Sequence, residues 1–184
     1  MHGTANTNGD NADTIKVEIN DNGNSGSGGG SNINLGTVNV DITAVNDAPV
    51  NTVPGAQTVN EDTSLAIGGL SVVDVDDNLS TVQLVVNNGT VNVTLSGAAS
   101  ISAGADGTNT LTLSGTQTDI NATLATLNYQ GNLNYNGADT LTVTSTDTNS
   151  ATDVDTVAIT VNAVNDAPSG ADKTSTFNVV STYT

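Results

Sequence analysis

Closely spaced aspartates are the residues of this chain best suited to chemistry. In the stretch DVDDN, Asp74 and Asp76 lie two residues apart after an apolar run, and Asp77 follows Asp76 directly. Residues two apart in an extended segment point the same way, and carboxylates held about 4 Å apart repel by about 4 kcal/mol at an effective dielectric constant of about 20. A bound divalent cation reverses this repulsion. With oxygen ligands and no cysteine or histidine cluster, the expected ion is hard, and calcium is the best candidate.

The same stretch also has a plain structural interpretation. Aspartate and asparagine are ordinary turn residues, so DVDDN by itself is more typical of a solvated loop than of an ion site. A second pair, Asp153 and Asp155 in the sequence DVD, is a weaker candidate for chemistry, and we expect it to lie in a loop.

No catalytic constellation is visible in the sequence. His2 is the only histidine, cysteine is absent, and Glu61 and Asp62 are neighbours whose side chains would diverge in a strand. Serine and threonine are plentiful, but none of them stands in a motif with a base that could activate it. We therefore expect a protein that is not an enzyme.

The charge of the chain restricts its partners. Asp and Glu together number 19 against 2 for Lys and Arg, which gives a net charge of −17. Such a surface repels nucleic acids and anionic membranes and attracts cations. No segment approaches the roughly 20 consecutive apolar residues of a membrane span. The expected partners therefore include neither nucleic acid nor a membrane into which the chain inserts.

An internal repeat sets the expected domain organisation. The sequence AVNDAP occurs at residues 44–49 and again at 163–168, which places Asn46 and Asn165 119 residues apart. The preceding segments also match, since ADTIKVEIND (12–21) aligns with ADTLTVTSTD (138–147). A spacing of this size is typical of a domain. We predict the C-terminal part of one repeat at 1–44, one complete repeat at 45–163, and the start of a third at 164–184.

Alternating apolar and polar residues predict strands throughout the complete repeat. The pattern has period two at 38–44, 82–86, 91–95, 111–113, 141–143 and 157–163, separated by turn sequences such as NNG and ADG. Helical spacing replaces it at 118–129, where Thr118 or Asp119 could cap a short helix. These features predict an all-β fold, an antiparallel β-sandwich with one short helical crossover. The apolar core should be thin, because the chain has 1 Phe, 3 Tyr and no Trp.

Longer motifs carry a family resemblance. The run LTVTSTDTNSATDVDTVAITVNAVNDAP, together with VNEDTSLAI and SVVDVDDN, resembles the cadherin-like tandem repeats of large bacterial surface adhesins over essentially the whole chain. The resemblance implies Ig-like sandwiches strung end to end on the bacterial cell surface, with calcium at each junction. It also implies the function of a calcium-stiffened extender repeat in cell adhesion and biofilm formation.

The resemblance further implies which residues bind calcium. At the N-terminal junction of the complete repeat they are Asn46, Asp47, Asp74, Asp76 and Asp147. At its C-terminal junction they are Glu61, Asn165 and Asp166. Ala44 and Ala163 stand where cadherins often place an aspartate, which implies fewer ions at each junction. No calcium ligand is expected near Val179.

Two other functions stay open on the sequence. The chain could be the subunit of a self-assembling extracellular fibre, in which partial repeats complete each other between identical chains end to end. It could instead be a calcium-dependent carbohydrate-binding module, although only Tyr129 and Tyr135 could serve the complete repeat as sugar platforms. The expected partners are thus neighbouring repeats, identical chains, and surface carbohydrate or host and biofilm matrix.

Overall fold

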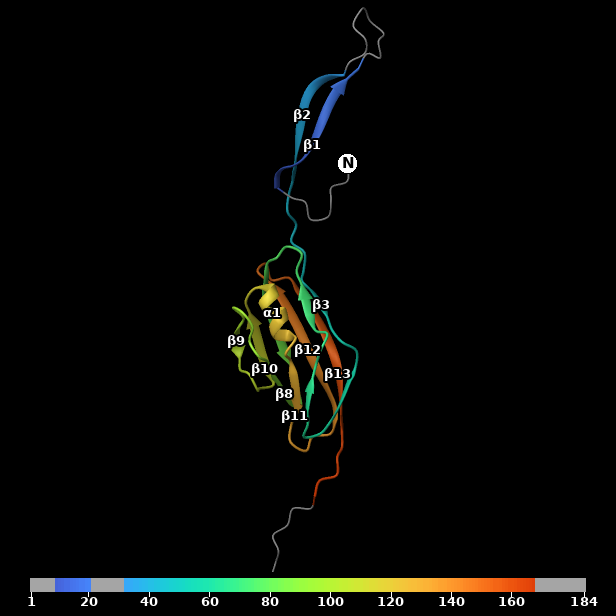
Figure 1. The fold of residues 1–184 in the computed structure, drawn as a ribbon, viewed down its shortest axis with the longest axis vertical. Coiled ribbons are helices and arrows are strands. Elements are labelled where there is room, and N and C mark those ends of the chain that lie inside the picture. Colours follow the sequence, from blue (N-terminus) through green and yellow to red (C-terminus); the bar gives the residue numbers. More distant parts are fainter. Residues whose placement is uncertain (1–8, 21–31, 168–184) are drawn as a thin grey trace, which may run out of the picture.

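Two parts of the chain are described by a computed structural model, residues 9–20 and residues 32–167. Strands β1 (Gly9–Ile19) and β2 (Ile33–Ile42) form an antiparallel hairpin. Figure 1 shows this hairpin apart from a sandwich of residues 50–162, to which residues 43–49 join it. Val179, near which no calcium ligand was expected, lies outside the described residues.

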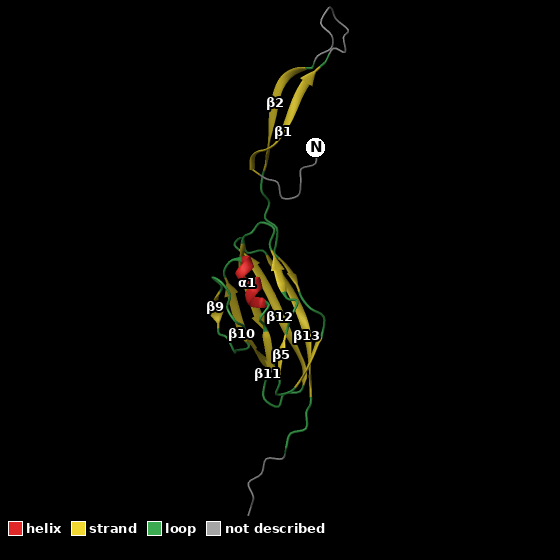
Figure 2. Ribbon diagram, in the orientation of Figure 1, coloured by secondary structure: helices red, strands yellow, loops and turns green. Residues whose placement is uncertain are grey.

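The sandwich confirms the predicted all-β class (Figure 2). Its larger sheet has six strands in the order β4 (Gln57–Asn60), β13 (Thr152–Asn162), β12 (Gly137–Asp147), β7 (Leu79–Val85), β10 (Thr110–Ser114) and β9 (Ser100–Gly104). A smaller sheet has the order β5 (Ser64–Ala66), β11 (Asn128–Gly131) and β8 (Gly89–Asn92). A short ladder joins β3 (Val50–Thr52) to β6 (Ser71–Val73). Neighbours are antiparallel except β4 and β13, which run parallel.

The expected helix is present, but it ends before the predicted segment 118–129 does, because Asn128 and Tyr129 lie in β11, and its cap is different from the one predicted. Helix α1 (Gln117–Leu124) connects β10 of the larger sheet to β11 of the smaller one. Thr116 is the N-cap residue, and its side chain accepts a hydrogen bond from the Asp119 N–H at 3.2 Å. The prediction of Thr118 or Asp119 as the cap is therefore wrong, because the helix starts one residue after Thr116. No helix of the described residues is long and apolar enough to cross a membrane.

The loop predicted at 153–155 is also wrong, because these residues lie inside β13. This strand pairs with β12 without interruption from Thr152 to Val161. Asp153 faces β3, where its Oδ2 accepts a hydrogen bond from the Asn51 N–H at 2.7 Å. The backbone N–H of Asn51 in β3 therefore donates to Asp153, whereas in a solvated loop water would be the donor.

Aliphatic side chains from both sheets and from α1 make the core. Tyr129 of β11 is the largest of the fully buried side chains and the one aromatic residue among them. The buried cluster consists of Val59, Ile67, Leu70, Val72, Leu79, Val82, Leu84, Val86, Val91, Leu111, Leu113, Ile120, Leu124, Leu127, Tyr129, Leu141, Val143, Val157, Ile159 and Val161.

The carboxylate of Asp139 is buried in contact with the core residue Tyr129. Asp139 of β12 is 4% exposed, and its Oδ2 accepts a hydrogen bond from the Tyr129 hydroxyl at 2.8 Å. It also accepts from the backbone N–H groups of Asn87 and Asn88, both at 3.0 Å, and of Thr140 at 2.8 Å. A buried carboxylate is tolerated when its lone pairs are satisfied in this way. The residue therefore ties the turn between β7 and β8 to strands of both sheets.

The Tyr129 ring packs closely against the backbone of Gly89. A Cβ atom on Gly89 would lie 2.5 Å from the Tyr129 ring, so only glycine lets the turn approach the ring. Burial, followed by the hydrogen bond to Asp139, raises the pKa of the Tyr129 hydroxyl well above its usual value. The hydroxyl therefore stays protonated and keeps donating to the carboxylate.

Replacing this hydroxyl tests its contribution to stability. We expect Tyr129→Phe to lower the free energy of unfolding by about 1–3 kcal/mol, because a buried carboxylate loses one donor. Tyr135→Phe is the matched control, since the Tyr135 hydroxyl donates to the exposed Ala138 carbonyl at 2.6 Å and water can replace it. Urea unfolding of both variants is the measurement, and equal losses would contradict the proposed importance of Asp139.

Candidate cation site at the linker junction

The loop after β6 carries the predicted aspartates, and two amide side chains of α1 hold it in place. Asn121 binds β6 at both ends of its amide, donating to the Val72 carbonyl and accepting from the Val72 N–H, each at 2.8 Å. The Gln117 side-chain oxygen accepts from the Asp74 N–H at 2.6 Å. Because β6 ends at Val73, the helix fixes the start of the loop.

The loop itself is a turn, and the strand geometry assumed for the Asp pair is wrong. Asp74 Oδ1 accepts from the Asp76 N–H at 3.0 Å, two residues along the chain, and Asp77 has a φ of 55°. This is the aspartate turn that competes with extended structure. Asp76 Oδ2 then accepts from the Asp47 N–H at 2.7 Å. Asp47 therefore contacts the loop through its backbone.

Asp147, at the end of β12, joins the linker to the sandwich. Its Oδ1 accepts from the N–H groups of Asn149 and Ala151, both at 2.8 Å. Its Oδ2 accepts from the Asn46 side-chain amide at 2.6 Å. The Asn46 hydrogen bond, helped by those of Ala151 and Asn149, holds the pKa of the Asp147 carboxyl below its usual value although burial opposes the shift. The charged form of Asp147 therefore binds the linker.

A chain of amides continues from this contact to the aspartate turn. The Asn46 amide donates to Asp147 and to the Asp47 carbonyl, at 2.6 and 3.1 Å, so its oxygen faces the other way. That oxygen accepts from the Asn78 amide at 2.8 Å. The far end of the Asn78 amide then lies 2.8 Å from Asp74 Oδ2 and 3.3 Å from Asp74 Oδ1.

These contacts cannot all be hydrogen bonds. The chain begins and ends on carboxylates, which only accept, and each amide between them has one donating and one accepting end. If Asn46 donates to Asp147, the Asn78 oxygen faces the Asp74 carboxylate. If Asn78 is rotated to donate to Asp74, its oxygen faces the Asn46 oxygen instead. One oxygen–oxygen contact remains in either orientation, and a cation or a proton between the two oxygens would relieve it.

The donor set at this point suits a hard cation better than any other ligand. Carboxylate and amide oxygens are the ligands that calcium prefers, at about 2.3–2.6 Å. A hollow of about 300 Å³ opens beside the network and is lined by Ala44, Val45, Asn46, Asp76, Asn78 and Asn149. In the described residues, however, no three acidic or histidine side chains converge closely enough to form a metal cluster. Any ion here would be held by amide and carboxylate oxygens together.

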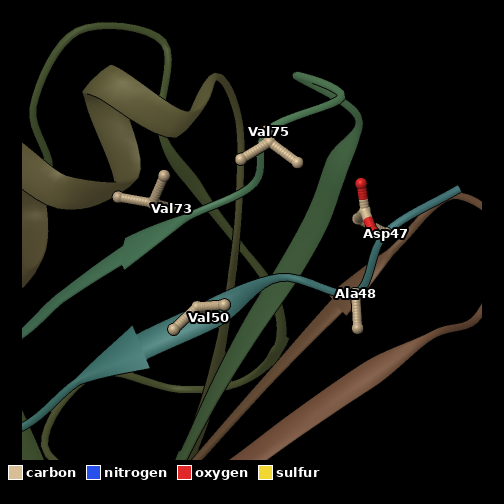
Figure 3. A pocket seen from close by; sticks show the side chains of 5 residues that line it. All are labelled: Asp47, Ala48, Val50, Val73 and Val75. Atoms are coloured by element: carbon tan, nitrogen blue, oxygen red, sulfur yellow. The ribbon is translucent and has the colours of Figure 1, made fainter. Parts of the chain in front are cut away.

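A second hollow near the linker has a different chemistry. It measures about 380 Å³, and Figure 3 shows the valine side chains along it, with Asp47 at one end. Val50 and Val73, which pair across β3 and β6, are 60% and 50% exposed. Its lining is Asp47, Ala48, Val50, Val73 and Val75. This apolar surface offers little to an ion.

The opposite pole of the sandwich holds the second linker. Glu61 is 5% exposed, and its Oε1 accepts from the Val164 N–H at 2.6 Å while its Oε2 accepts from the Asn136 amide at 3.3 Å. The Asn165 amide donates to the Asp166 carbonyl at 3.2 Å, as the corresponding asparagine does in the first linker. Glu61 therefore reaches the linker one residue before the predicted Asn165 and Asp166.

The structure thus brings together most of the residues predicted at the first junction. Asn46, Asp74, Asp76 and Asp147 belong to one hydrogen-bonded network, to which Asp47 adds its backbone N–H. Sequence reasoning missed Asn78, although it closes the DVDDN motif and is the residue that links the two carboxylates. The amides of α1 gave no sequence signal, because their partners lie more than 40 residues away.

Comparison with known proteins gives one family match. Residues 68–156, a little under half of the chain, match the family described as "Protein GAMETE EXPRESSED 2 domain". The match begins just before β6 and ends within β13, so it covers the aspartate turn and α1. No curated protein matches the chain.

This match overturns the family predicted from the sequence. The family that matches is a eukaryotic gamete-expressed one, so the identification as a cadherin-like repeat of bacterial surface adhesins is wrong. The extender function in adhesion and biofilm formation and the bacterial cell-surface location are therefore also wrong, and the match does not support the fibre and carbohydrate alternatives either. The motifs that suggested the adhesins are linkers and aspartate turns, which follow from turn chemistry in many β-sandwiches.

The linker contact to Asp147 has a consequence for acid titration. We expect Asn46→Ala to raise the pKa of Asp147, because the largest contribution to its lowering is lost. The stabilisation from a lowered carboxyl pKa is present above the unfolded-state value of about 3.9 and is lost as the pH falls through the folded-state value. In the variant, this loss should begin at higher pH. Carbon-detected NMR titration of the Asp147 carboxyl is the measurement, and an unchanged midpoint would contradict the assignment.

Proposed function

We propose that residues 45–166 are a noncatalytic β-sandwich module of a gamete-expressed protein, and that this module holds its N-terminal linker in a fixed orientation. The gamete assignment rests on the family match over residues 68–156. The role of the module rests on one observation, the clamping of the linker. Asn46 and Asp47 bind side chains 101 and 29 residues away in the sequence, at 2.6 and 2.7 Å.

The clamp is suited to setting the direction of the chain between two folded units. Linkers are normally exposed and make few contacts, whereas here two consecutive residues are bound to the end of β12 and to the loop after β6. The acceptors are carboxylates, which form stronger hydrogen bonds than neutral groups. A unit joined through residues 43–49 would therefore keep a narrow range of orientations relative to the sandwich.

Calcium is the proposed partner of this clamp. It would bind beside Asp74 and Asn78, where the amide chain leaves two oxygens in contact at 2.8 Å. Asp76 and Asn46 are among the residues that line the adjacent hollow. A bound ion would replace the oxygen–oxygen contact with two attractive ones and connect the turn to the linker. At a hundredfold excess over the dissociation constant, binding adds about 2.7 kcal/mol to stability.

Replacing Asp74 distinguishes the stability that a bound ion adds from the stability that the hydrogen bonds of the network give. In Asp74→Asn the new amide can donate to the Asn78 oxygen, so the network is satisfied without an ion. We expect the variant to melt at a higher temperature than the parent protein in chelator. We also expect the increase that millimolar calcium gives the parent to be lost in the variant. Differential scanning calorimetry with and without calcium measures both effects.

Asp155→Asn is the matched control, since it removes the same charge from a residue paired with Val143 in the middle of β12. Asp153 would not serve, because it binds the Asn51 N–H. The control should keep the full calcium response. If the parent protein does not respond to calcium, the calcium proposal is wrong.

The clamp itself has a separate readout. NMR relaxation of the amides at 45–48 should give order parameters close to those of the sandwich, at about 0.85. Asn46→Ala combined with Asp76→Ala should lower them toward the values of a free linker while the sandwich remains folded. Rigid linker amides in the double variant would contradict the proposed function.

A further inference from the structure

The hairpin of β1 and β2 has one polar and one apolar face. Ile15 pairs with Val38 and Ile19 pairs with Ile33, and alternate residues of a strand share a face. Val17 therefore lies on the same face as these four residues. The five side chains are between 38% and 62% exposed in the described structure. A hairpin that exposes such a face is at best marginally stable in water.

The opposite face of the hairpin is charged and suited to solvent. Lys16 and Glu18 alternate with the apolar residues of β1, and they form an ion pair at 2.5 Å. Thr37 lies opposite Lys16 in the ladder. The hairpin is thus built to bury one face only, as an outer strand pair of a sandwich does.

The same ladder occurs a second time in the chain, in β12 and β13. From Asp13 to Val17 the two hairpins have the same register, whereas a bulge after Val17 interrupts the first ladder and not the second. The corresponding pairs are Asp13↔Val40 with Asp139↔Ile159, Ile15↔Val38 with Leu141↔Val157, and Val17↔Gly36 with Val143↔Asp155. On the face of the second hairpin that enters the core, by contrast, the apolar side chains are at most 3% exposed; they are Leu141, Val143, Val157, Ile159 and Val161.

The second hairpin shows what such a face packs against. Leu141 and Val157 belong to one buried cluster with Ile120 and Leu124 of α1 and with Tyr129 of β11. The cover is thus a layer made of the smaller sheet and α1 (Figure 2). This layer lies before β12 in the chain, and only residues 132–136 separate β11 from β12.

We propose that the apolar face of β1 and β2 docks a second copy of this layer, carried in a longer form of this chain on the N-terminal side of these 184 residues. The hairpin is then the last strand pair of a second sandwich of the same architecture. The apolar residues of β1 and β2 have the spacing of those of β12 and β13, which the layer covers. In the described sandwich the layer precedes this strand pair in the chain, so the second layer is expected before β1. This inference is independent of the calcium proposal and of the clamp.

A tandem chimera tests the proposal on the whole chain. Residues 45–137 are placed directly before Ala12, which aligns with Ala138, and residues 12–184 are kept. We expect hydrogen exchange of the hairpin amides at 14–18 and 37–41 to slow by about 10³-fold or more, the protection expected of a folded domain core. A second cooperative unfolding transition should accompany it. The control chimera carries Ile120→Asp and Leu124→Asp in the added copy only, and its hairpin should exchange as fast as in the original chain.

Other occupants of the face predict different results. If the hairpin amides of the original 184-residue chain are already protected, another segment of the chain or a second copy covers the face, and sedimentation distinguishes these two; either result overturns the proposal. Unprotected hairpin amides in a folded chimera would also overturn it.

A second measurement covers the case in which the chimera fails to fold. The original chain should bind an apolar dye, and Val17→Asp with Val38→Asp should abolish most of this binding without changing the melting of the sandwich. Dye binding that does not respond to these substitutions would show that the face is not open, and the proposal would be wrong.

Discussion

The hydrogen bond between the Tyr129 hydroxyl and the buried Asp139 carboxylate is the contact around which the sandwich is organised. With 1 Phe, 3 Tyr and no Trp in the chain, a single tyrosine provides the large side chain at the centre of the core. Its hydroxyl needs an acceptor, and the acceptor needs further donors once it is buried. Asn87 and Asn88 supply them through their backbone N–H groups. One polar interaction thereby fixes both sheets and the turn between them.

The same use of carboxylates recurs at the edges of the fold. Asp147 binds the N–H groups of its own turn, Glu61 binds the second linker, and Asp153 binds β3. A chain with a net charge of −17 thus uses many of its acidic side chains as hydrogen-bond acceptors for loops. At the first linker there are too few hydrogen-bond donors. The amides of Asn46 and Asn78 lie in a row between the carboxylates of Asp147 and Asp74, and they cannot donate to both carboxylates and also bind each other. This local deficit is the physical reason to expect a cation there.

The family match shows how far turn chemistry can mislead an assignment of function. The VNDAP linkers and the DVDDN turn resemble the motifs of a calcium junction in sequence, and this resemblance led to the wrong family of proteins. Aspartate and asparagine occupy such turns because their side chains bind neighbouring backbone groups, whatever the protein does. A β-sandwich with acidic junctions is compatible with many functions, so the fold does not decide the function, and the proposed assignment to a gamete-expressed protein rests on the match over residues 68–156.

The sequence by itself predicted the strands β2, β7, β8, β10, β12 and β13, a short helix, the repeated linker and most of the residues that meet at the first junction. These follow from local patterns, since alternation, helical spacing and turn residues act over a few positions. The tertiary structure decided which groups meet. In the structure the helix cap is Thr116, Asp153 lies in a strand, and Asn46 binds Asp147, which is 101 residues away in the sequence. Such contacts depend on how distant strands pack, and no local pattern specifies which donor reaches which carboxylate.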